Sequence, residues 1–177
     1  MQQVLASLTE EMIVAATEKL LHPFVALWKA YCHLSLFLWG EGDWKLRPLH
    51  QMVIDHLLSL LNPDLSETVR LQLQQRYFVQ FIPDGRVNSI YFNNLPRHLV
   101  ISDSDFSNAL YKIEMYVDGI KQQVIITFST GQIFTIEFRK DSNFYKGKKI
   151  RFGAITRGSP NQSYAGVIDR LEHGTAE

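Results

Sequence analysis

Residues 112–128 read KIEMYVDGIKQQVIITF, and apolar and polar side chains alternate on both sides of Asp118–Gly119. Alternation with a period of two is typical of a strand that buries one face. An Asp–Gly pair tolerates the backbone angles of a two-residue turn between antiparallel strands. The segment therefore predicts a hairpin of strands Lys112–Val117 and Ile120–Phe128. Its register pairs Val117 with Ile120, Met115 with Gln122 and Ile113 with Val124.

A second hairpin is predicted upstream, where Tyr77–Ile82 and Arg86–Phe92 flank Pro83–Asp84–Gly85. Such a loop suits a hairpin because its glycine supplies the left-handed backbone position. Downstream, Lys149–Ile155 follows a polar loop and predicts one more strand. The side chains that we expect to point inward from this last strand are Ile150, Phe152 and Ala154.

The turn after the central hairpin can be chosen by the pairing that it produces. A loop at Ser129–Thr130–Gly131 sets apolar side chains opposite each other, pairing Ile126 with Phe134 and Val124 with Ile136. A two-residue loop at Thr130–Gly131 would instead set the same two side chains opposite polar ones. Because a half-buried sheet needs an apolar core face, we expect the three-residue loop.

The N-terminal residues follow helical periodicity, since apolar side chains recur there at steps of three and four residues. Pro23 permits a break between the first two helices, and Pro48 suits the first turn of the third. The predicted helices span residues 4–20, 23–39, 48–61 and 66–75, with short ones at 103–110 and Tyr164–His173.

Helices followed by strands indicate an α+β fold. We expect three to four N-terminal helices packed on a C-terminal antiparallel meander of about six strands. The chain has 177 residues, of which 46% are hydrophobic, so intrinsic disorder is excluded. This length is typical of a single domain over residues 1–177. Its parts would be a helical part at 1–76, an antiparallel sheet at 77–157 and a tail with a short helix at 158–177.

The segment Leu20–Gly40 is nearly apolar and long enough to span a bilayer. Lys29 lies in its middle, where a charge costs about 2.5–3.5 kcal/mol on insertion scales. We therefore expect a buried core helix and no membrane association. Cys32 is the only cysteine, so no intrachain disulfide forms, and a reducing, cytoplasmic location fits.

No catalytic or metal-binding pattern stands out. Cys32 and His33 are neighbours on a predicted helix, so their side chains point in different directions, and we expect Cys32 to be a buried structural residue. The histidines lack the spacing of a helical zinc site, and there is no Cys-x-x-Cys. Asp103 and Asp105 could bind a divalent cation, but capping of a short helix is the preferred interpretation. We expect no cofactor, no metal and, on balance, no enzyme.

Charge is unevenly distributed along the chain. Lys plus Arg and Asp plus Glu are both 18, giving a net charge of zero. Residues 1–84, however, carry six basic and nine acidic groups, whereas residues 111–157 carry nine basic and four acidic groups. Basic and aromatic side chains are interleaved in the latter part. The candidate partner-binding residues are Lys121, Arg139, Lys140, Tyr145, Lys146, Lys148, Lys149 and Arg151.

Three functions remain open. The preferred one is a non-catalytic protein-binding module, of the inhibitor, immunity, adaptor or chaperone kind, whose basic sheet surface meets an acidic protein. The first alternative is single-stranded nucleic-acid binding by phosphate contacts and base stacking. The second is a small enzyme or ligand carrier with a pocket between helices and a curved sheet. Basic residues that protect an edge strand from aggregation also explain the pattern. The sequence indicates no oligomeric state.

Overall fold

The computed structural model describes residues 23–82 and 85–158. The chain divides into two compact units, Met1–Gly40 and Glu41–Glu177. Two predicted helices, residues 4–20 and Tyr164–His173, lie outside the described residues, as does part of the predicted loop Pro83–Asp84–Gly85.

Residues 23–38 form the described helix of the first unit, and its side chains are not buried. The exposed apolar side chains of the helix and of the residue after it are Phe24, Val25, Leu27, Trp28, Tyr31, Leu34, Phe37, Leu38 and Trp39. The prediction of a buried core helix is therefore wrong: apolar side chains lie on all sides of this helix, and no second described element of its unit packs against them. Cys32 is half-buried and free. Among the described residues, no helix combines the length and the apolarity that crossing a bilayer requires.

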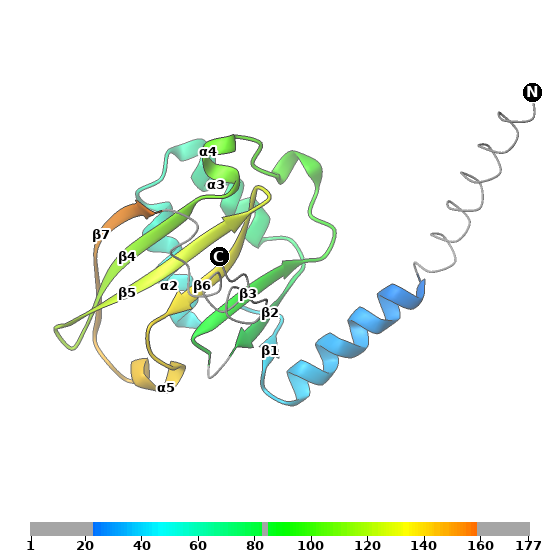
Figure 1. Ribbon diagram of the computed structural model, residues 1–177, viewed down its shortest axis with the longest axis horizontal. Coiled ribbons are helices and arrows are strands. Elements are labelled where there is room, and N and C mark those ends of the chain that lie inside the picture. Colours follow the sequence, from blue (N-terminus) through cyan, green and yellow to red (C-terminus); the bar gives the residue numbers. More distant parts are fainter. Residues whose placement is uncertain (1–22, 83–84, 159–177) are drawn as a thin grey trace, which may run out of the picture. The chain divides into compact units, whose positions relative to one another are not determined.

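The second unit is built on an antiparallel sheet. Its strands are β1 (Gly42–Asp43), β2 (Tyr77–Ile82), β3 (Val87–Phe92), β4 (Leu110–Val117), β5 (Ile120–Ser129), β6 (Gln132–Phe138) and β7 (Ile150–Gly158). They lie in the order β1-β2-β3-β6-β5-β4-β7 (Figure 1). Hairpins join β4 to β5 and β5 to β6, and β7 returns to lie beside β4, as in a Greek key. The predicted α+β fold is confirmed.

Two helices pack on one face of the sheet. Helix α2 (Pro48–Leu58) and helix α3 (Pro63–Leu73) each begin with a proline, whose missing N–H costs nothing there. The Asn62 side chain caps α3 by accepting a hydrogen bond of 2.7 Å from the Leu65 amide. The remaining helices are single turns: η1 (Arg97–Leu99), α4 (Ser104–Ser107) and α5 (Ser142–Tyr145).

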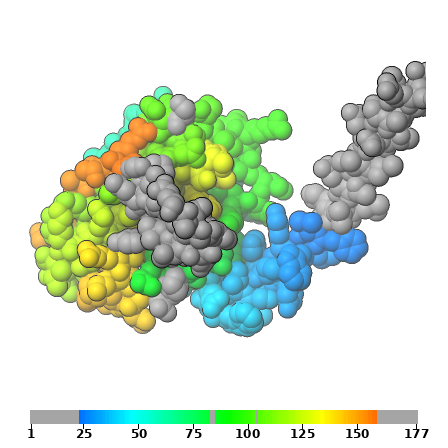
Figure 2. Space-filling view, in the orientation of Figure 1, coloured from blue at the N-terminus to red at the C-terminus, as the bar shows by residue number. Residues whose placement is uncertain are grey.

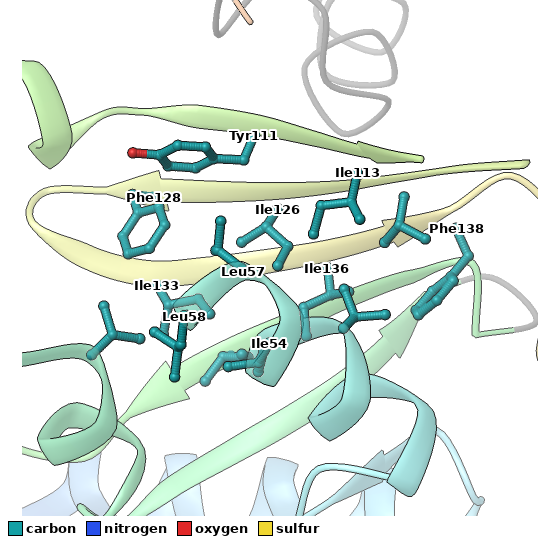
Figure 3. Close-up of a cluster of buried hydrophobic side chains, with 14 of the residues drawn as sticks. Ile54, Leu57, Leu58, Tyr111, Ile113, Ile126, Phe128, Ile133, Ile136 and Phe138 are labelled. Carbon is teal, nitrogen blue, oxygen red and sulfur yellow. The ribbon is translucent and has the colours of Figure 1, made fainter. Parts of the chain in front are cut away.

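The core lies between α2 and the sheet (Figure 3). Side chains of α2 face apolar side chains of β5 and β6, and the buried residues labelled there include Ile54, Leu57, Ile126, Ile133 and Ile136. Burial of a side chain of this size contributes about 1.5–3 kcal/mol. The packing of α2 on β5 and β6 stabilises the sheet that carries the candidate surface.

The register of the central hairpin is confirmed, with Val117 opposite Ile120 and Ile113 opposite Val124. Asp118 and Gly119 both have positive φ, at 51° and 84°, as the turn requires. From Tyr111 to Val117, side chains at odd positions of β4 are buried and those at even positions are half-buried, whereas Leu110 at the start of the strand is also buried. One face of the sheet therefore meets the helices, as predicted.

The prediction of a three-residue loop after β5 is wrong. Thr130 and Gly131 form a two-residue turn, with Ser129 opposite Gln132. A register shift beyond Phe128 leaves Phe134 without an opposite residue in β5. This bulge restores the apolar pairing that a two-residue turn alone would lose, since it sets Ile126 opposite Ile136 and Val124 opposite Phe138.

A second bulge changes the inward face of β7. Met115 lies opposite Phe152, but Ile113 lies opposite Ile155, so β7 has one extra residue at Gly153–Ala154. Ile150 and Phe152 pack against the core as predicted. Ala154 is exposed, so its predicted inward position is wrong, and Ile155 takes that place against the core.

Candidate protein-interaction surface

Seven of the eight predicted site residues are exposed basic side chains. We call Lys121, Arg139, Lys140, Lys146, Lys148, Lys149 and Arg151 together the basic surface. The eighth, Tyr145, is 4% exposed and belongs to the hydrophobic core, so its ring does not face a partner. The basic surface comes from the β4–β5 hairpin, the β6–β7 connection and β7 itself. In Figure 2 this connection, in yellow to amber, lies beside the yellow-green tip of the hairpin.

Tyr145 anchors the connection to the sheet. Its ring packs on Phe138 at the end of β6, with ring centres 5.3 Å apart. Its hydroxyl accepts a hydrogen bond of 3.3 Å from the Lys140 amide. The Asp141 side chain begins α5 by accepting a bond of 3.0 Å from the Phe144 amide. These contacts fix the backbone of the connection, and the side chains of Arg139, Lys140 and Lys146 extend from it into solvent.

The end of the connection is tied to the β4–β5 turn. The Lys149 amide donates a hydrogen bond of 3.0 Å to the Asp118 carboxylate. The Asp118 amide donates one of 2.9 Å to the Lys149 carbonyl. Before this tie, the Lys148 ammonium lies 3.5 Å from the centre of the Phe144 ring, within the range of a cation–π contact. The connection is therefore an ordered part of the basic surface.

Two members of the basic surface lie in one row across the sheet. Lys121 of β5 and Arg151 of β7 both lie opposite Tyr116 of β4, so all three share a face. The Lys121 ammonium also donates to the Glu114 carboxylate. This hydrogen bond raises the pKa of Lys121 and lowers that of Glu114, so both groups stay charged at neutral pH. Water screens such an exposed pair, and its effect on stability is small.

The sequence-based site omitted Arg157, a basic residue on the same edge strand. Its guanidinium donates to the Asp105 carbonyl and lies 5.3 Å from the centre of the Phe106 ring. Arg157 was missed because the predicted strand stopped at Ile155, whereas β7 continues to Gly158. The basic charge at residue 157 was the signal that could have found it.

Elsewhere, side chains of types that could take part in chemistry have structural roles. Asp103 caps α4 by accepting a hydrogen bond of 2.8 Å from the Asp105 amide, which confirms the capping interpretation. Within residues 23–82 and 85–158, no three His, Cys, Asp or Glu side chains gather as metal ligands would. His56 stacks on Phe152, and Trp44 packs edge-on against Phe78.

A scan against protein-family models finds no match, and searches of curated proteins and of solved structures find no significant similarity.

Proposed function

We propose that this chain is a non-catalytic protein-binding module whose basic surface binds an acidic protein. The observation that carries this proposal is the exposure of seven basic side chains on an ordered connection, the adjoining hairpin and β7. Opposite charge on a partner would speed association and orient the complex. The proposal includes a cytoplasmic location, which the single free cysteine supports.

The aromatic residues favour a protein partner over single-stranded nucleic acid. Base stacking requires ring faces that are open to solvent. Here Tyr145 is buried, Phe144 is covered by Lys148, and Phe152 stacks on His56. The aromatic rings of the basic segment thus already contact other side chains of this chain. The interaction that remains for a ligand is with the positive charges.

Affinity purification from an extract of the source cells, with the chain as bait, tests the proposal. We expect the wild type to retain an acidic protein that is released as salt screens the charges. The double variant Lys148→Glu plus Arg151→Glu should lose this protein. As a matched control, Lys45→Glu plus Arg76→Glu reverses two exposed charges outside the basic surface and should retain it.

Two results would overturn the proposal. The first is a retained protein that both double variants bind equally well. The second is a preparation in which nucleic acid, rather than protein, is released by salt and lost from the Lys148→Glu plus Arg151→Glu variant. A salt titration with single-stranded oligonucleotides on the same variants separates these cases.

A further inference from the structure

Strand β7 is the outermost strand at one side of the sheet (Figure 1). It pairs with β4 on its inner side, and among the described residues no strand pairs with its outer side. An edge strand presents a row of backbone N–H and C=O groups that a further strand can bind. The outer side of β7 is therefore a place where another chain can add a strand.

The register shows which residues form this row. Asp118 donates its amide to Lys149, whereas Ala109 accepts from Phe128 of β5. Even positions of β4 thus bond to β7 and odd positions to β5, because bonding alternates along an antiparallel pair. In β7, Arg151, Thr156 and Gly158 lie opposite even positions of β4. The residues whose backbone groups point to the outer side are then Ile150, Phe152, Ile155 and Arg157.

The bulge divides this row into two short runs, before and after Gly153–Ala154. His56 of α2 holds the bulge in place, because its Nε2 donates a hydrogen bond of 3.0 Å to the Gly153 carbonyl. Its ring also stacks on Phe152, with ring centres 4.9 Å apart. Helix α2 therefore supports the edge strand through His56. Two residues with outward backbone groups lie before the bulge and two lie after it.

The basic side chains on and beside β7 determine which kind of strand can pair with its outer side. Residues 146–158 contain five basic side chains and no acidic one. Two copies of β7 laid side by side would place like charges across from each other, which is unfavourable. A strand with acidic side chains would instead form cross-strand pairs of opposite charge. The edge thus repels a second copy of itself and suits an acidic strand.

We propose that the outer side of β7 binds an extended acidic segment of the partner protein as an additional strand of the sheet. Backbone hydrogen bonds would supply affinity, and the basic side chains would select the charge of the segment. This inference rests on the proposed function, since it names how the acidic partner is recognised.

The probe is a capped peptide of alternating threonine and glutamate residues, long enough to span β7, titrated at low ionic strength. We expect the wild type to bind it, and the amides of Ile150, Phe152, Ile155 and Arg157 to exchange more slowly in the complex. A peptide methylated at the nitrogens of two adjacent central residues lacks one donor on each of its two sides, so it loses one backbone hydrogen bond to β7 whichever side faces the strand. It should bind about fivefold more weakly, the effect of a lost backbone hydrogen bond.

A matched pair of protein variants tests the backbone hydrogen bonds between β7 and the peptide by changing β7 instead of the peptide. Arg157→Ala removes the guanidinium but keeps the outward amide, whereas Arg157→Pro removes both. Proline is tolerated at such an edge position. We expect Arg157→Pro to bind the peptide about fivefold more weakly than Arg157→Ala. Should the proline variant not fold, the methylated peptide on the wild type decides the question.

Three results would overturn strand addition: no binding of the peptide to the wild type, equal binding of the methylated peptide, or equal binding by the two folded variants at residue 157. In each case the proposed function is judged separately by the affinity purification. If the Lys148→Glu plus Arg151→Glu variant still loses a partner there, the basic surface is used but the edge of β7 is not.

Discussion

Gln72 is a fully buried polar side chain that joins three distant segments of the second unit. Its Nε2 donates to the carbonyls of Leu99 and Gly131, at 2.7 and 2.9 Å. Its Oε1 accepts a bond of 3.1 Å from the Ile133 amide. Glutamine on a short helix is usually solvent-facing, so nothing in the sequence marks this residue. Its role depends on backbone groups that only the fold brings near it.

His50 predicts a pH dependence of stability. It is buried against Phe81 and Phe138, and burial, followed by the nearby charge of Arg47, lowers its pKa from 6.5 to about 4. Between these values the unfolded chain binds more protons at this residue, so acidification favours unfolding. We expect the free energy of unfolding to fall by roughly 3 kcal/mol between pH 7 and pH 4, since one pKa unit corresponds to about 1.4 kcal/mol.

The measurement is urea denaturation across this pH range, for the wild type and for His50→Leu. The variant keeps an apolar side chain in the core but has no group to titrate, so the difference between the two proteins isolates residue 50. Its free energy of unfolding should decline less on acidification. Parallel curves for the two proteins would show that His50 does not contribute.

At the scale of elements, two turn glycines differ in what surrounds them. Both have positive φ, 84° at Gly119 and 78° at Gly131. A Cβ on Gly119 would meet nothing within 4 Å, whereas one on Gly131 would lie 2.3 Å from the Ile101 carbonyl oxygen. We expect Gly119→Ala to cost about 1 kcal/mol, from backbone strain alone. Gly131→Ala should cost more than about 3 kcal/mol, because the Ile101 backbone must also move.

Urea denaturation of the two alanine variants measures this difference, and each serves as the control for the other. Similar losses of stability in both would mean that the segment around Ile101 adjusts freely. A well-folded Gly131→Ala with wild-type stability would contradict the expected contact.

The strands show which features of the sheet the alternation of apolar and polar residues predicts. It placed β2 at its observed bounds, and the Asp118–Gly119 turn set the register of β4 and β5. It failed at the β5–β6 turn and in β7, and in both places the structure has a bulge. A bulge adds one residue to one strand, and alternation in a single strand does not show where that occurs. At the β7 bulge, the contact that marks the position comes from His56 of α2, which is far away in the sequence.

At the scale of the whole molecule, the chain consists of two compact units. We expect a chain of residues 41–177 to unfold cooperatively with a free energy of unfolding within about 1 kcal/mol of the full chain, because its core is its own. It should also bind less of the dye ANS, since the exposed apolar side chains of residues 23–39 are gone.

Denaturation and dye fluorescence of both chains at equal concentration test this expectation. Loss of cooperative unfolding in the shorter chain would contradict it, as would unchanged dye binding. Deletion leaves the basic surface complete, so the shorter chain should also retain the same partner in affinity purification.

Charge counting showed that residues 146–158 carry five basic side chains and no acidic one, and this local charge does not depend on the fold. It did not distinguish exposed from buried members: Tyr145 stands among exposed lysines in the sequence, yet its ring packs on Phe138. Nor did it show that Lys121 is paired with Glu114, since the two are brought together by the register of β4 and β5.

The sequence by itself determined the α+β class, the central hairpin and the position of the positive charge, because each follows from local periodicity, turn chemistry or composition. Tertiary structure alone decided the order of the strands, the two bulges, the burial of Gln72 and the placement of β7 at the edge of the sheet. Those features depend on contacts between residues far apart in the chain, and the free energy of such contacts is set by how helices and strands fit together rather than by any one segment.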